Sequence, residues 1–122
     1  MGLRILLVED HNDTRHTLWQ LLRHFHYDVV TAPDYETACN ILDNLSFDIL
    51  LSDIRLLGGD GCDLVMEAKS KQQLVAIALS ALGTIQDEER GVSCGFDHYF
   101  VKPLDFNRLR AVLDEITLQH ES

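Results

Sequence analysis

The sequence predicts an α/β domain in which a doubly wound, five-stranded parallel sheet is covered by five helices. Three observations predict this class. Short apolar segments of strand length alternate along the chain with longer segments of helical periodicity. The strand segments are apolar almost throughout, which is typical of strands covered on both faces. The 122 residues contain no repeat or linker, so residues 1–122 are expected to form one domain with right-handed crossovers.

The first strand and helix are predicted at the N-terminus. Arg4–Val8 is a short apolar strand, and the acidic pair Glu9 and Asp10 follows it directly. Asp13 is expected to cap the next helix. That helix has an apolar stripe at the i, i+3, i+4, i+7 spacing, formed by Leu18, Leu21, Leu22 and Phe25.

The second and third strands follow the same plan. Asp28–Ala32 is the second strand, and a Pro-Asp pair then begins a helix that extends to about Leu45. The third strand, from Phe47 to Leu51, leads to Asp53, an acidic residue at the end of a buried run. A helix cap or a turn would explain Asp53 if no other acidic residue were placed in this way.

A glycine-rich loop over residues 56–61 separates the third strand from a helix at about Asp63–Lys71. Such a loop can cradle phosphate groups. This one lacks the Gly-x-x-x-x-Gly-Lys pattern and follows an acidic strand end, so we do not predict a nucleotide site.

The fourth strand, Leu74–Leu79, is followed by Ser80. Thr84 and Asp87 have the spacing of a capping box, which predicts the start of the fourth helix. Two glycines near the end of that helix lower its propensity, so we expect it to be comparatively mobile.

The fifth strand, Asp97–Val101, leads to Lys102 and Pro103. Asp105 is expected to cap the last helix. The apolar face of that helix is formed by Leu109, Val112, Leu113 and Ile116.

Composition limits the classes of function. Twenty acidic residues against ten basic ones give a formal charge of -10, which repels nucleic acid and anionic lipid. No apolar run is long enough for a membrane span or a signal peptide, which predicts a soluble intracellular protein. The three cysteines lack a Cys-x-x-Cys pair and are expected to be free thiols. The six histidines show no ligand spacing and are expected to be solvated or core residues.

Polar residues lie just past the carboxyl ends of four of the five predicted strands: Glu9, Asp10, Asp53, Ser80 and Lys102. The carboxyl ends of parallel strands share one edge of the sheet, so we expect these side chains to meet. Three crowded carboxylates imply a cation, and oxygen ligands favour Mg2+, which also takes phosphate oxygens. A lysine and a hydroxyl suit a transferring phosphoryl group, and Asp53 is the expected nucleophile.

These residues stand in four short motifs: Leu-Val-Glu9-Asp10, Ser52-Asp53-Ile54 with Gly61 eight residues beyond the aspartate, Leu79-Ser80-Ala81, and Gly95-Phe-Asp-His-Tyr99-Phe-Val-Lys102-Pro103. In this combination the chain resembles a receiver domain of two-component response regulators over essentially its whole length. The resemblance implies a flavodoxin-like fold with strand order 2-1-3-4-5.

The resemblance also implies roles for the residues. Asp53 would be the phosphoacceptor, and Glu9 and Asp10 would organise Mg2+ together with the backbone carbonyl of Arg55. Ser80 would bond a phosphoryl oxygen and Lys102 would pair with it.

Further implications concern switching and partners. Tyr99 matches the aromatic switch residue, and the Lys102–Pro103 bond matches one that is cis in the family. The donor would be a sensor histidine kinase or a histidine phosphotransfer protein, and the changed surface would be the fourth helix, fifth strand and fifth helix. The protein would be cytoplasmic, with no nucleic acid bound by this domain and no separate substrate turned over.

Some positions depart from the family pattern. Leu57 stands where the family usually has proline, and Arg55 and Leu82 occupy positions that tune phosphoryl lifetime. The region from Lys102 to Leu109 resembles the receivers of hybrid sensor kinases. No effector domain follows the last helix, so the chain is expected to be either a stand-alone receiver or part of a longer protein.

Two other functions remain open at this stage. A receiver-like interaction domain without phosphorylation would keep the fold, although the intact acidic set argues against it. An aspartate-nucleophile phosphatase would carry a second aspartate two residues after Asp53, where this chain has Arg55.

Overall fold

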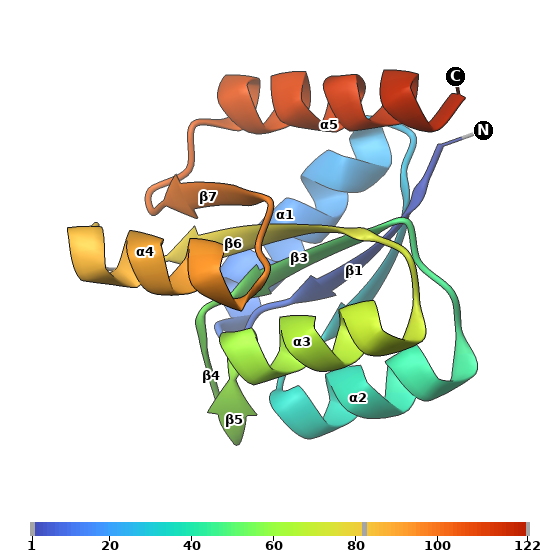
Figure 1. Cartoon of the computed structure of the whole chain (residues 1–122). Helices are drawn as coiled ribbons and strands as arrows, with labels where there is room; N and C mark the ends of the chain where they lie inside the picture. The colour runs from blue at the N-terminus through green and yellow to red at the C-terminus, as the bar shows by residue number, and fades with distance from the viewer. Residues whose placement is uncertain (1, 82, 122) are drawn as a thin grey trace.

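The computed structural model describes residues 2–81 and 83–121. Within these residues the main sheet has five parallel strands in the order β2-β1-β3-β6-β7, which confirms the predicted doubly wound topology (Figure 1). The strands are β1 (Arg4–Val8), β2 (Asp28–Ala32), β3 (Ile49–Asp53), β6 (Val75–Ser80) and β7 (His98–Val101).

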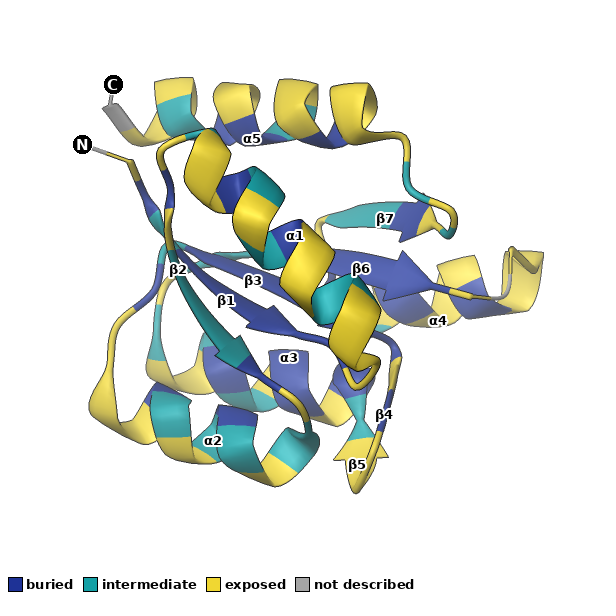
Figure 2. Ribbon diagram, turned by 180° about the vertical axis from the view of Figure 1, so that it is seen from behind, coloured by how far each residue is buried: buried dark blue, intermediate teal, exposed yellow. Residues whose placement is uncertain are grey.

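The helices form a layer on each face of the sheet. They are α1 (Asn12–His24), α2 (Tyr35–Asn44), α3 (Gly61–Lys71), α4 (Ile85–Cys94) and α5 (Phe106–Glu121). Helices α1 and α5 cover one face, and α2, α3 and α4 lie on the other (Figures 1 and 2). On α1 and α5 the buried residues lie on the side that faces the sheet and the exposed ones on the outer side (Figure 2), as the apolar periodicity predicts.

Successive side chains of each strand point to opposite faces of the sheet, which divides the hydrophobic core into two clusters. Leu6, Val8 and Leu50 join the cluster under α2 and α3, whereas Ile49 and Leu51 join the cluster under α1 and α5. Strand β3 is buried along its whole length, which explains the apolar run at its first three positions, Ile49–Leu51. Each fully buried leucine or isoleucine contributes about 1.5–3 kcal/mol, so this central strand is strongly fixed.

The helix caps follow the sequence in most places. Asp34 and Asp60 accept hydrogen bonds from the first turns of α2 and α3, and Asp105 does the same for α5. The predicted cap of α1 is wrong: His11 is the N-cap, without a side-chain bond, and Asp13 lies in the first turn. There its negative charge still faces the positive end of the helix dipole.

The glycine-rich loop contains a small feature that the sequence did not predict. Strands β4 (Arg55–Leu56) and β5 (Gly59–Asp60) pair antiparallel as a short hairpin between β3 and α3. Exposed Leu57 lies at its tip, and its carbonyl accepts a hydrogen bond from Tyr35 N at 3.2 Å. The hairpin therefore holds the chain just after Asp53 in a defined path.

The expectation of free cysteines is wrong for two of the three. Cys62 at the start of α3 and Cys94 at the end of α4 form a disulfide, with a Cα–Cα distance of 5.4 Å, and Cys39 is free. They are 32 residues apart in the sequence. Packing of α4 beside α3 brings them together, and no short spacing motif announces such a pair.

Among the described residues, no helix combines the length and apolar character needed to cross a membrane.

Candidate functional site

The register of the parallel strands brings four of the predicted site residues to one edge of the sheet: Glu9, Asp53, Ser80 and Lys102. Val8 lies opposite Ser52, Asp53 opposite Leu79, and Ser80 opposite Val101. Residues that end or follow these strands must therefore lie side by side. Backbone hydrogen bonds continue the ladder past the strand ends, such as Lys102 N to Ser80 O at 2.8 Å.

Asp53 lies at the centre of this edge and is only 5% exposed. Ser52 Oγ donates to the Asp53 carbonyl at 2.9 Å, and Ile54 N donates to Leu79 O at 3.0 Å. A Cβ atom at position 61 would collide with the Asp53 carbonyl oxygen. Only glycine fits there, which explains the glycine eight residues after the aspartate.

Lys102 connects the acidic residues. Its Nζ lies 2.9 Å from Asp53 Oδ1 and also contacts Glu9 Oε1. The Glu9 side chain is fully buried, and the Lys102 side chain is 23% exposed. A cation placed between two buried carboxylates offsets part of their mutual repulsion.

The pKa values of the two carboxylates move in opposite directions. Burial, helped by the neighbouring Glu9 and opposed by Lys102, raises the pKa of Asp53 to about 8. Burial also raises the pKa of Glu9, but hydrogen bonds with Asp53 and Lys102 outweigh it and lower the value to about 2. Without a bound cation the pair therefore shares one proton over a wide pH range. The pKa of Lys102 is raised, because its two carboxylate partners outweigh burial, which alone would lower it.

The donor set fits a hard divalent cation. Asp53 Oδ1 is buried and, among the described groups, has no partner in good hydrogen-bond geometry despite its ion pair with Lys102. Ligand atoms of Glu9, Asp10 and His11 lie within 4.8 Å of one another. Carboxylate oxygens at a half-open edge suit Mg2+, which keeps several waters. His11, expected to be solvated, is exposed but lies 3.3 Å from Asp10 Oδ1.

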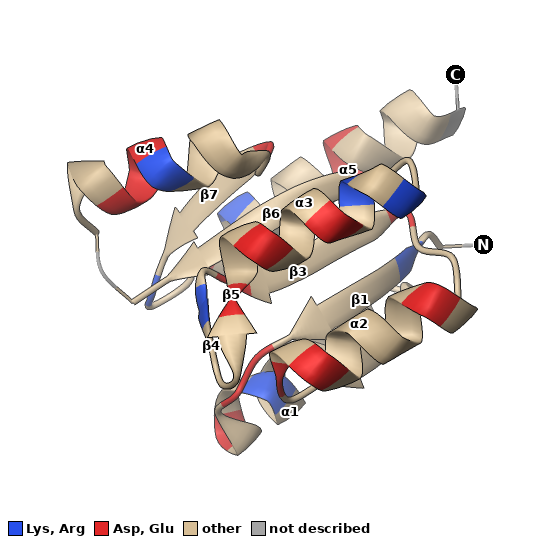
Figure 3. Ribbon diagram, turned by 60° about the horizontal axis from the view of Figure 1, so that its bottom comes forward, with Lys and Arg blue, Asp and Glu red and all other residues tan. Residues whose placement is uncertain are grey.

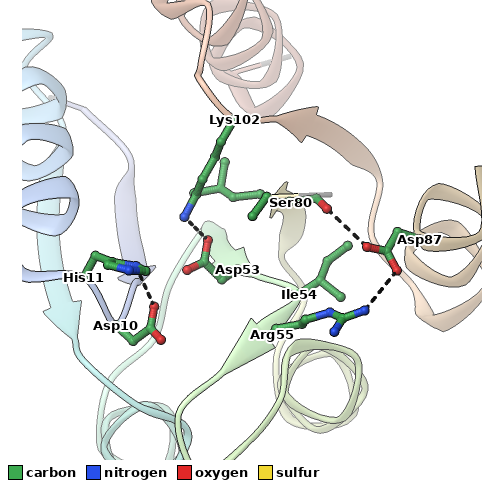
Figure 4. A pocket seen from close by; sticks show the side chains of 10 residues that line it. Asp10, His11, Asp53, Ile54, Arg55, Ser80, Asp87 and Lys102 are labelled. Carbon is green, nitrogen blue, oxygen red and sulfur yellow. Dashed lines mark hydrogen bonds and ion pairs between the residues drawn. The ribbon is translucent and has the colours of Figure 1, made fainter. Parts of the chain in front are cut away.

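A hollow opens above these groups (Figure 4). Its walls come from five places in the chain: the loop after β1, the segment 53–55, the end of β6, α4, and Lys102 after β7. Ala81 is part of the lining, so no large side chain at this position blocks access to Asp53. The loop after β1 carries acidic residues (Figure 3).

One carboxylate of this hollow was not predicted as part of the site. Asp87 of α4 is 9% exposed, and Ser80 Oγ donates to its Oδ2 at 3.5 Å. Arg55 Nη2 lies 3.8 Å from Asp87 Oδ1 (Figure 4). The Thr84 half of the predicted capping box is present, with Thr84 Oγ1 accepting from Asp87 N at 3.1 Å. The Asp87 carboxylate, however, is directed toward Ser80 and Arg55.

Tyr99 lies away from the lining of the hollow, half-buried on β7 against α4. A Cβ atom at position 91 would lie 3.4 Å from its ring, so Gly91 allows close approach. The Lys102–Pro103 peptide bond is cis. Leu82, one of the two positions expected to tune phosphoryl lifetime, lies outside the described residues.

Comparison with protein families gives a match over most of the chain. The model described as "Response regulator receiver domain" matches residues 5–114.

Individual relatives agree with this match. The two-component response regulator PhoP of Pseudomonas aeruginosa is 33% identical over 115 residues, which cover 93% of this chain and 51% of PhoP. The phosphate regulon transcriptional regulatory protein PhoB of Escherichia coli K12 is 32% identical over 124 residues, 96% of this chain and 54% of PhoB. The chain thus spans about half the length of these relatives.

Solved structures share the fold. A two-component response regulator from Clostridium difficile superimposes with a TM-score of 0.94 at 21% identity, covering 99% of this chain and 100% of that one. The receiver domain of the sensor histidine kinase PA1611 from Pseudomonas aeruginosa gives 0.85 at 28% identity, covering 94% and 97%. That structure has a magnesium ion coordinated in its active-site cleft.

Proposed function

This chain belongs to the response regulator receiver domain family, and from that premise we propose that it is a phosphorylation-dependent switch whose phosphoacceptor is Asp53. The observation that carries the proposal is a buried carboxylate, 5% exposed, at an open sheet edge with a lysine amine 2.9 Å away. Such a carboxylate has a nucleophilic oxygen, a positive neighbour and an approach path, which phosphoryl transfer requires.

In the proposed transfer, an Asp53 oxygen attacks the phosphorus of a partner's phosphohistidine in line with the leaving nitrogen. The new P–O bond forms as the P–N bond breaks, and the imidazole leaves after taking up a proton. Because Lys102 Nζ lies 2.9 Å from Asp53 Oδ1, it is close enough to bind an oxygen of a phosphoryl group attached to Asp53. Its fixed charge stabilises the three phosphoryl oxygens.

Glu9, Asp10 and Asp53, with the backbone carbonyl of Arg55, would hold the Mg2+ ion. When bound, the ion supplies positive charge that balances the phosphoryl oxygens and the crowded carboxylates. The magnesium seen in the PA1611 receiver supports this assignment.

Switching would follow from the new charge. The phosphoryl group on Asp53 carries about two negative charges, which attract the Ser80 hydroxyl at the same edge. Tyr99, packed close to Gly91 of α4, would turn inward as Ser80 moves. The surface formed by α4, β7 and α5 would then change shape and alter the affinity for a downstream partner.

The partners follow from the same chemistry. The donor would be a sensor histidine kinase or a histidine phosphotransfer protein, and no separate substrate would be turned over. The formal charge of -10 makes nucleic acid an unfavourable partner for this domain. Residues 1–122 would act as one receiver domain, either alone or within a longer regulator or hybrid kinase.

We place the protein in the cytoplasm, where two-component regulators meet their kinases. Disulfides are rare in this reducing compartment and usually transient there, so we expect the Cys62–Cys94 bond to form in the cytoplasm only transiently. Trapping thiols with an alkylating agent at the moment of cell lysis measures whether the bond exists in the cell.

Incubation with acetyl phosphate and Mg2+, followed by intact-mass measurement, tests the transfer. We expect the mass of one added phosphoryl group, absent in Asp53→Ala and strongly reduced by EDTA. No added mass under conditions that label a known receiver would instead indicate an interaction domain without phosphorylation. Steady release of phosphate from a free phosphomonoester would indicate a phosphatase.

A further inference from the structure

Asp87 is a buried carboxylate that the proposed transfer does not use. It lies on the first turn of α4, lines the same hollow as Asp53, and its side chain is 13% exposed. A carboxylate is rarely buried without a partner that offsets its desolvation. Its partners are Ser80, at 3.5 Å, and Arg55, at 3.8 Å (Figure 4).

Both partners are donors that a phosphoryl group on Asp53 would attract. Ser80 follows the β6 residue paired with Asp53, and Arg55 is two residues beyond Asp53 in the chain. A phosphoryl group carries about two negative charges and three strong acceptor oxygens. Asp87 is therefore an internal anion that competes with it for the same donors.

The contacts of Asp87 with Ser80 and Arg55 are weak enough for a phosphoryl group to replace them. At 3.5 Å the Ser80–Asp87 bond is at the long limit for a hydrogen bond, so a better acceptor can replace it. The Arg55 side chain is 72% exposed, and an exposed ion pair contributes little. The Ser80 contact, which is buried, should account for most of the coupling.

We propose that Asp87 is a positioning residue that holds Ser80 and Arg55 away from Asp53 in the unphosphorylated protein and gives them up to the phosphoryl group. The proposal rests on the function proposed above. Because Asp87 belongs to α4, the same exchange releases the beginning of that helix. Asp87 thus shortens the lifetime of the phosphorylated state and connects the state of Asp53 to the position of α4.

The lifetime in question is that of the aspartyl phosphate. In its hydrolysis a water oxygen bonds to phosphorus, the P–O bond to Asp53 breaks, and inorganic phosphate leaves with the carboxylate restored. Donors bonded to the phosphoryl oxygens stabilise the phosphorylated ground state. Without Asp87 as a competing acceptor, the aspartyl phosphate should last longer, and a larger fraction of the protein should be phosphorylated at steady state.

The test compares Asp87→Asn and Asp87→Ala with Glu88→Gln, a change to an exposed acidic residue on the same turn. Each variant is phosphorylated with acetyl phosphate and Mg2+, the donor is removed, and the phosphorylated fraction is followed by intact mass. We expect a roughly threefold to tenfold longer half-life for both Asp87 variants, the range that one ordinary hydrogen bond of about 1 kcal/mol provides. The control should match the wild type.

A second comparison separates positioning from a structural role. In a Ser80→Ala background, Asp87→Asn should change the half-life far less, because the main donor that Asp87 competes for is gone. An equal effect with and without Ser80 would overturn the proposal, as would half-lives for the Asp87 variants that match the control. If the wild type gains no phosphoryl group, the proposed function fails instead. Asp87→Asn keeps the shape of the side chain, so it serves if Asp87→Ala does not fold.

Discussion

The shared proton of Asp53 and Glu9 should make the stability of the metal-free protein fall as pH rises through neutrality. The unfolded chain loses both protons near the ordinary pKa values of 3.8 and 4.5, whereas the folded pair keeps one up to about pH 8. A carboxyl with a raised folded pKa stabilises the fold fully at low pH, and that stability is lost between 3.8 and about 8. Glu9 acts oppositely, and its contribution is lost only as pH falls from 4.5 toward about 2.

The magnitude follows from one proton. Each pH unit in this window changes the free energy of unfolding by about 1.4 kcal/mol per proton. From about pH 5 to about pH 7.5 the pair should therefore lower stability by about 3 kcal/mol. Asp53→Asn removes the titrating carboxyl and should remove that slope.

The assay is urea denaturation in EDTA, followed by circular dichroism at several pH values. Subtracting the Asp53→Asn curve from the wild-type curve cancels the contribution of the remaining charges, which both proteins share. Asp10→Asn, a change to a partly exposed carboxylate beside Glu9, should keep the wild-type slope. Parallel wild-type and Asp53→Asn curves between about pH 5 and about pH 7.5 would refute the shared proton.

Three further predictions follow from the site and the disulfide. Calorimetric titration with Mg2+ at neutral pH, in two buffers of different ionisation enthalpy, should show release of close to one proton per ion. The proton shared by Asp53 and Glu9 must leave when the ion binds, so equal heats in both buffers would contradict this prediction. Lys102→Met should lower the free energy of unfolding by about 2 kcal/mol at about pH 9, above the Asp53 pKa of about 8, where both carboxylates are ionised, and by less at about pH 5. An equal loss at both pH values in urea denaturation would contradict the bridging role. Cys62→Ser should lower the free energy of unfolding by about 3.5 kcal/mol, because it removes a cross-link across 32 residues, whereas Cys39→Ser should lower it far less. Thermal unfolding with and without reductant measures both changes. Similar losses for the two variants would show that the disulfide does not form.

The fold was predictable because its signals are local. Continuous apolar runs identify buried parallel strands, and the i, i+3, i+4 stripes identify covering helices, so strand and helix positions needed no knowledge of the tertiary structure. Boundaries were less certain. Asp13 is as good a cap by type as any residue nearby, but the backbone places His11 at that position.

The site was predictable as far as it depends on strand ends. The register of β1, β3, β6 and β7 brings Glu9, Asp53, Ser80 and Lys102 together because parallel strands end at one edge. What escaped prediction depends on how α4 docks. Asp87 and Gly91 are buried, four residues apart on one face of that helix. That spacing was the available signal, but a capping box explained Asp87 sufficiently from sequence alone.

The disulfide gives α4 two unequal ends. Its last residue, Cys94, is covalently tied to α3, whereas Asp87, about 10 Å earlier along the axis, is held by contacts that a phosphoryl group can replace. A helix that is fixed at its C-terminal end and released near its N-terminal end can rotate about the fixed end. In the oxidised protein we therefore expect phosphorylation to tilt α4 about Cys94, with the largest displacement at exposed Ile85. Reduction would free the pivot and let the whole helix slide.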